Sequence, residues 1–201
     1  MIAHDTRNNI KMWGKDSILV NALAYDAYAD ANLVLTAGGS YTVINVTIAN
    51  MAGTAYLVVA ADTSGSGSTP ISIYNSIFYN DNPLMEGTLL YFGPEAETPT
   101  LSHNLFFNPY RTDAVICADF APYNGQCFSD VELNSGAPIG SNLTYADPLF
   151  VDAAARDYQL TPNSPARDAG LSDVNGLPTI DLAGNARVSG DQVDIGAFEL
   201  K

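Results

Sequence analysis

Basic residues are scarce in this chain of 201 residues. Lysine and arginine total 8 against 22 aspartates and glutamates, so the formal net charge is −14. A surface of this kind repels nucleic acid and anionic lipid, and it favours neutral partners or divalent cations. No apolar stretch approaches the roughly 20 residues that are needed to cross a bilayer. We therefore expect no nucleic-acid partner and no membrane span.

Cysteine and histidine are also rare. Cys117 and Cys127 are the only cysteines, and His4 and His103 are the only histidines. Because neither histidine is near the cysteines in sequence, a zinc site is disfavoured. The separation of ten residues allows a disulfide in an oxidising compartment, and two free thiols are the alternative. We predict the disulfide.

An apolar run of the signal-peptide type is missing from residues 1–7. A cytoplasmic protein and an excised or mature segment of a secreted one both fit this observation. Because the remaining sequence looks extracellular, we favour a segment of a larger surface protein, with an added start methionine.

The composition is typical of a folded β protein. Hydrophobic residues make up 47% of the chain and charged residues 15%, which excludes a disordered acidic tail. One domain is the simplest expectation for this length. Residues 63–70 and 93–99 have the composition of loops, and we interpret them as exposed excursions inside that domain.

A short sequence motif that contains asparagine recurs along the first half of the chain. Asn21, Asn45, Asn75 and Asn104 lead its copies, at steps of 24, 30 and 29 residues. This period fits one turn of a three-sided β-helix, and the alternating β-branched and aromatic residues around it favour strands. Successive coils would stack about 4.8 Å apart. We predict that the four asparagines form a ladder of side-chain amides where the chain turns.

Four short motifs close the chain. They are Asp147-Pro-Leu-Phe-Val-Asp152, Asp157-Tyr-Gln-Leu160, Asn163-Ser-Pro-Ala-Arg-Asp-Ala-Gly170 and Val193-Asp-Ile-Gly-Ala-Phe-Glu199. This ordered series resembles the closing segment of bacterial right-handed parallel β-helix surface proteins, the choice-of-anchor Q type of the broad pectate-lyase-like group. The resemblance covers residues 142–201 and implies a secreted or cell-surface location. It identifies no reaction.

The repeat and the resemblance together predict an all-β fold, a right-handed parallel β-helix (a single-stranded solenoid) of about four to six coils. Residues 1–141 would form the coils, and residues 142–201 an irregular C-terminal cap of the same domain. Because a solenoid exposes unpaired strand edges at its ends, we expect the cap to cover the last coil. The side chains expected to do so are Phe150, Tyr158, Leu160 and Phe198.

Lyases of the pectate-lyase-like group act on acidic polysaccharides. Their reaction needs a strong base, usually Arg or Lys, and cations that neutralise the substrate carboxylate. No basic residue occurs between Lys15 and Arg111, the stretch that holds nearly all recognisable coils. Arg111, with Asp113 and Asp119, is the only basic candidate beside the stack, and an ion pair within a loop is its simpler interpretation.

An inverting glycoside hydrolase needs only two carboxylates, set roughly 6.5–9.5 Å apart. Asp26 with Asp30, and Glu95 with Glu97, are the candidate pairs. The motifs of β-helix polygalacturonases do not occur in the chain. A polysaccharide hydrolase or lyase is therefore kept as the alternative function.

A carbohydrate-binding surface is one of two non-catalytic functions, and a stalk or display module is the other. Tyrosines of the coils can stack on sugars, and Tyr74, Tyr79 and Tyr91 are the candidates, although packing explains most tyrosines more simply. We predict a non-catalytic extracellular or surface domain that serves adhesion, display or polysaccharide association. The lack of a base or cation cluster in the coils supports this prediction.

Calcium is the one cofactor that the sequence suggests. Asp147, Asp152 and Asp157, or Asp173 and Asp181, would have to converge to hold it, and their spacing matches no standard calcium loop. No other cofactor is expected.

Overall fold

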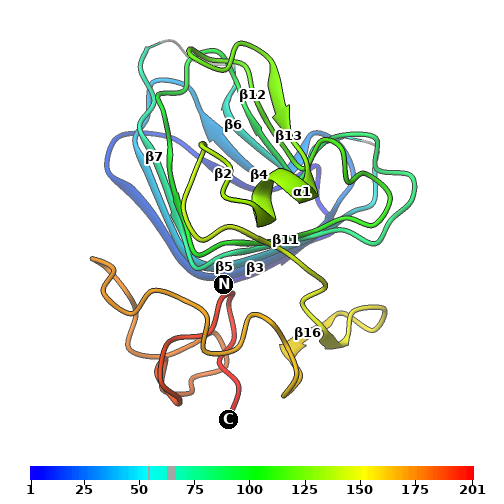
Figure 1. Cartoon of the computed structure of the whole chain (residues 1–201), viewed down its shortest axis with the longest axis vertical. Coiled ribbons are helices and arrows are strands. Elements are labelled where there is room, and N and C mark those ends of the chain that lie inside the picture. Colours follow the sequence, from blue (N-terminus) through cyan, green and yellow to red (C-terminus); the bar gives the residue numbers. More distant parts are fainter. Residues whose placement is uncertain (54, 63–66) are drawn as a thin grey trace.

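The computed structural model describes residues 1–53, 55–62 and 67–201. The chain is mostly β and forms a parallel β-solenoid of about four turns, with a C-terminal region outside it (Figure 1). This confirms the predicted all-β parallel solenoid. Residues 63–66 of the predicted loop 63–70 lie outside the described residues.

Two sheets form the walls of the solenoid, and the chain passes from one to the other in each turn. Sheet 1 has the order β1-β3-β5-β8-β11-β14, with β7 beside β5 and β10 beside β7. Its strands are β1 (Ile2–His4), β3 (Ser17–Ala27), β5 (Tyr41–Met51), β7 (Ile71–Tyr74), β8 (Ile77–Tyr79), β10 (Thr100–Ser102), β11 (Leu105–Phe107) and β14 (Thr144–Tyr145). Sheet 2 has the order β13-β12-β9-β6-β4-β2. Its strands are β2 (Asn8–Met12), β4 (Ala31–Thr36), β6 (Val58–Asp62), β9 (Leu90–Phe92), β12 (Ile116–Ala118) and β13 (Gln126–Phe128).

Equivalent residues of successive turns stack in the interior of the solenoid. Leu19, Val43 and Ile73 form one such column, and all three are buried. The rings of Phe78 and Phe106 stack with 5.0 Å between their centroids. Strands about 4.8 Å apart bring like side chains into direct contact, so a period of one turn in the sequence becomes a continuous core.

A column of residues with left-handed backbone marks a corner of sheet 1. Asn21, Asn45 and Asn75 lie in register there, with φ of 47°, 51° and 50°. Asparagine tolerates this conformation better than most residues that have a Cβ, which explains why it recurs. His103 and Asn142 continue the column in the following turns, with φ of 54° and 49°.

The predicted ladder member Asn104 is not in this column. The pairing of β10 with β7 and of β11 with β8 sets His103 beside Asn75, and Asn104 beside Ser76. The side chain of Asn104 accepts a hydrogen bond from the Ser76 amide (2.9 Å) and donates one to the Ile73 carbonyl (2.8 Å). The prediction was wrong by one residue because a histidine, not an asparagine, holds the left-handed position in that turn.

The ladder amides bond mainly to the C-terminal region instead of to one another. One amide-to-amide contact joins Asn75 Nδ2 to Asn45 Oδ1, at 3.4 Å. Asn45 Nδ2 donates to the carbonyls of Asp194 (2.8 Å) and Gly196 (3.2 Å). Asn75 exchanges two hydrogen bonds with the backbone of Leu171, at 2.9 and 2.7 Å. The corner column is therefore a docking surface for the end of the chain.

Residues 146–201 lie along the outside of sheet 1, on the side of β3 and β5 in Figure 1, and contain the hairpin of β15 (Phe150–Asp152) and β16 (Asp157–Leu160). A second apolar core fills the space between sheet and region. It contains Leu23, Ala49, Ile77, Tyr79, Leu105, Tyr158, Leu160, Ala166 and Ile195, with Phe150 and Phe198 packed against them. The predicted position of the cap was therefore wrong. These side chains cover the flank of the solenoid across several turns and not its last coil.

A short helix covers the end of the solenoid. Figure 1 shows α1 (Asp130–Asn134) over the middle of the ring of strands, and the buried side chains of Leu133 and Ile139 belong to the main core. A capping box between Ser129 and Glu132 fixes the start of this helix. Among the described residues, no helix has the length and hydrophobicity to span a bilayer.

Replacing Asn75 with leucine is expected to cost about 1–3 kcal/mol of unfolding free energy. Leucine cannot make the two bonds to Leu171, and it is strained at a φ of 50°. Equilibrium denaturation measures the loss. An exposed asparagine with a φ of 46°, Asn124, provides the control, because Asn124→Leu adds the backbone strain at a site outside the ladder. If both variants lose the same stability, the bonds to the C-terminal region contribute nothing.

Candidate functional site

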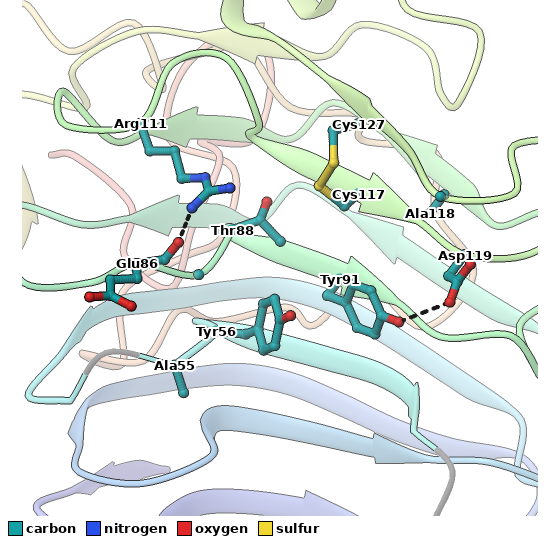
Figure 2. Close-up of a pocket in the computed structure, with 12 residues that line it drawn as sticks. Ala55, Tyr56, Glu86, Thr88, Tyr91, Arg111, Cys117, Ala118, Asp119 and Cys127 are labelled. Carbon is teal, nitrogen blue, oxygen red and sulfur yellow. Dashed lines mark hydrogen bonds between the residues drawn. A yellow bond between two sulfur atoms is a disulfide. The ribbon is translucent and has the colours of Figure 1, made fainter.

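A pocket of about 590 Å³ lies on the outer face of sheet 2, over β9 and β12. Figure 2 shows the residues that line it, drawn from three successive turns and from β13. The chemically informative ones are Tyr56, Glu86, Thr88, Tyr91, Arg111 and Asp119, together with Cys117 and Cys127. The pocket has the size of a small-molecule or sugar site.

Strand alternation places the central pocket residues on the outer face. Leu90 and Phe92 are fully buried in the core, so Tyr91 between them points outward. The same alternation turns Cys117 outward from β12, and the register of β12 on β9 sets Cys117 beside Tyr91. The parallel stacking of turns thus joins residues 26 positions apart into one surface.

Two tyrosines form the aromatic part of the pocket. The rings of Tyr56 and Tyr91 stack with 5.0 Å between centroids and 26° between planes. The hydroxyl of Tyr91 donates to Asp119 Oδ2, at 3.4 Å. Burial, and then the charge of Asp119, raise the pKa of Tyr91, so this hydroxyl stays protonated and remains a hydrogen-bond donor at neutral pH.

Arg111 lies across the pocket from Asp119 (Figure 2). Its Nη1 donates to the backbone carbonyl of Glu86, which directs the guanidinium along the pocket wall. Its Nε is buried and, among the described residues, has no hydrogen-bond partner. The pocket therefore presents a cationic group on one side and a carboxylate on the other.

A disulfide joins Cys117 and Cys127 at the edge of the pocket. The two residues are directly opposite each other in the antiparallel pair of β12 and β13, with 4.0 Å between their Cα atoms. β13 is the last strand of sheet 2, so the bond ties the edge of that sheet to the strand that carries Cys117.

Asp26 and Asp30, the first candidate carboxylate pair, lie outside the pocket. Asp26 pairs with Arg156 at 2.6 Å, and burial raises its pKa. Asp30 pairs with Arg7 at 3.3 Å, and hydrogen bonds from Arg7 and Asn8 lower its pKa. Each carboxylate is occupied by a different arginine, and neither lines the pocket. The structure does not bring these two carboxylates together in the pocket, and their role as a catalytic pair stays a prediction.

The second predicted pair, Glu95 and Glu97, is also outside the pocket. Both residues follow β9 in the excursion 93–99, where Ala96 forms an isolated bridge with Thr69. The carboxylate of Glu97 accepts a hydrogen bond from the Ser68 hydroxyl. These contacts hold two loops of neighbouring turns together.

Of the three predicted tyrosines, only Tyr91 lines the pocket. Tyr74 is half-buried on β7, in the other sheet. Tyr79 is 7% exposed and packs edge-on against Phe150, under the C-terminal region. A sugar cannot reach its ring, so the prediction for Tyr79 was wrong. The sequence offered no sign that the end of the chain would fold back over this strand.

The three predicted calcium ligands serve turns instead. Asp147 Oδ1 accepts from the amide of Leu149 (2.9 Å), and Asp152 Oδ1 accepts from that of Ala155 (3.0 Å). Asp157 Oδ1 accepts from the amide of Gln159, at 3.1 Å. Within the described parts of the chain, no three His, Cys, Asp or Glu side chains are grouped to hold a metal ion.

The sequence indicated Tyr91 and Arg111 but not Glu86 and Thr88, which line the same pocket. Neither residue belongs to a repeat or a motif, so no signal in the sequence could have found them. A scan of protein-family models, a search of curated proteins and a search of solved structures each found no match for this chain.

Proposed function

We propose that this chain is a non-catalytic extracellular domain of a larger bacterial surface protein, and that it binds polysaccharide in the pocket over β9 and β12. The observation that carries the proposal is the stacked pair Tyr56 and Tyr91, placed between the hydrogen-bonding groups of Arg111, Glu86 and Asp119. Sugars have apolar C–H faces and many hydroxyls. Aromatic rings with charged and polar groups at their edges match both features.

The extracellular location has independent support. A disulfide persists in an oxidising compartment, and this chain carries one with no free cysteine among the described residues. The closing motifs resemble those of the choice-of-anchor Q surface proteins. A net charge of −14 keeps an exposed domain soluble and favours partners that are not polyanionic.

Replacing Tyr91 with alanine is expected to weaken glycan binding roughly 10-fold, because the variant loses both the ring and the hydroxyl. A glycan array selects the ligand, and calorimetry then measures the dissociation constant of both proteins. Tyr28→Ala is the matched control, since Tyr28 is 61% exposed and lies outside the pocket. Equal loss in both variants would mean that the pocket is not where the glycan binds.

Hydrolysis is the second candidate function, because Glu86 and Asp119 are two carboxylates of one pocket. An activity screen on neutral and acidic polysaccharides, with and without calcium, tests it. Release of reducing or unsaturated ends that Glu86→Gln and Asp119→Asn abolish would make the protein an enzyme. Binding without turnover supports the proposal, whereas neither binding nor turnover would leave a stalk or display module.

A further inference from the structure

Arg111 differs from every other arginine of the chain in its surroundings. Within the described residues, each of the others forms an ion pair with a carboxylate: Arg7 with Asp30, Arg156 with Asp26, Arg167 with Asp168 and Arg187 with Glu199. Among the described side chains Arg111 forms none, although acidic residues are abundant in the chain. An unpaired guanidinium on the wall of a pocket can form an ion pair with a bound anion.

We propose that the glycan presents an acidic group, a carboxylate or a sulfate, to Arg111. This inference rests on the proposed function. The Glu86 carbonyl holds Nη1 and so fixes the guanidinium on the pocket wall. Because Nε is buried, an oxyanion in the pocket would bond to the outer Nη groups. Such a charge-assisted hydrogen bond is roughly twice as strong as one to a neutral sugar hydroxyl.

The charge around Arg111 limits how many acidic groups the ligand carries. Glu86 and Asp119 are the other charged residues of the pocket, so it holds two carboxylates and one cation. With a net charge of −14, the whole protein repels a polyanion. The ligand is therefore a heteropolysaccharide in which single acidic sugars are separated by neutral ones, not a polyuronate.

The test measures the binding of four tetrasaccharides to the intact chain by calorimetry. The first carries one uronate flanked by neutral sugars, the second is its methyl ester, the third has a sulfate ester in place of the carboxylate, and the fourth is made of uronates throughout. The first is expected to bind roughly 10- to 100-fold more tightly than its methyl ester. The third tells whether Arg111 accepts sulfate as well as carboxylate. The fourth is expected to bind more weakly than the first.

Arg111→Gln is expected to remove the difference between the uronate and its ester, and Arg111→Lys to restore only part of it, because lysine lacks the guanidinium that the Glu86 carbonyl holds in place. Arg167→Gln is the control, since the Arg167 side chain is half exposed and outside the pocket. Equal binding of acid and ester to the wild type overturns this inference but leaves the proposed function standing. Tightest binding of the all-uronate ligand also overturns it. If no tetrasaccharide and no array glycan binds, the proposed function itself fails.

Discussion

Replacing Arg187 with methionine is expected to cost about 3–5 kcal/mol of unfolding free energy. The side chain is 1% exposed and lies 3.7 Å from the carboxylate of Glu199. It also donates to the carbonyls of Gly196 (3.2 Å) and Ala197 (3.1 Å), and to Oδ1 of Asn21 in the corner column. Methionine fills much of the same volume but leaves a buried carboxylate and three acceptors without this donor.

The loss is measured by equilibrium denaturation, with Arg167→Met as the control. Arg167 also pairs with a carboxylate, that of Asp168, but its side chain is 50% exposed. Removing an exposed pair of this kind changes stability by at most about 1 kcal/mol. A cost below about 1 kcal/mol for Arg187→Met would mean that Arg187 is not what holds the C-terminal region on the solenoid.

Unfolding free energy is expected to fall by about 3 kcal/mol as the pH rises from 4.5 to beyond 7, through the titration of Glu199. The Glu199 side chain is 1% exposed, and its burial raises its pKa from 4.5 to about 7. Burial also raises the pKa of the neighbouring Asp194. Below pH 4.5 Glu199 is protonated in both the folded and the unfolded protein, so its contribution to stability is complete. Above the folded pKa the folded protein must hold the charged form in its interior, and that contribution is lost.

The variant Glu199→Gln separates this effect from all other titrations. Glutamine keeps an acceptor for the amide of Asp194 or Ser189 but does not ionise, so the stability of the variant is expected to change less between pH 4.5 and 8. Glu97→Gln, on an exposed residue, is expected to keep the slope of the wild type. Stability that rises with pH in the wild type, or an unchanged slope in Glu199→Gln, would contradict the assignment.

Both predictions concern a buried polar cluster, which the sequence indicated only as a closing motif. The closing run Val193-Asp-Ile-Gly-Ala-Phe-Glu199 marked the segment as special without giving it a partner. In the structure, Asp194, Gly196 and Ala197 bond to Asn45 and Thr47, some 150 residues earlier. Turn chemistry explains none of these three contacts. The motif instead encodes a surface that matches the corner column of the solenoid.

The sequence alone predicted only part of the asparagine ladder. Asn21, Asn45 and Asn75 were found because a left-handed corner repeats once per turn and favours asparagine. Asn104 was misassigned because the sequence shows a choice of residue but not the register of hydrogen bonds. Pairing of β10 and β11 with the preceding turn decides that His103 occupies the corner.

The sequence by itself determined the class of fold, because a hydrophobic period of one coil can be buried only by stacking coils. It also singled out Tyr91 and Arg111, one as an aromatic and the other as the only cation beside the stack. Only the tertiary structure decided that these two share a pocket while Tyr79, Asp26 and Asp30 do not. The reason is geometric: which face of a turn a residue occupies depends on register, and which faces stay open depends on where residues 146–201 fold back.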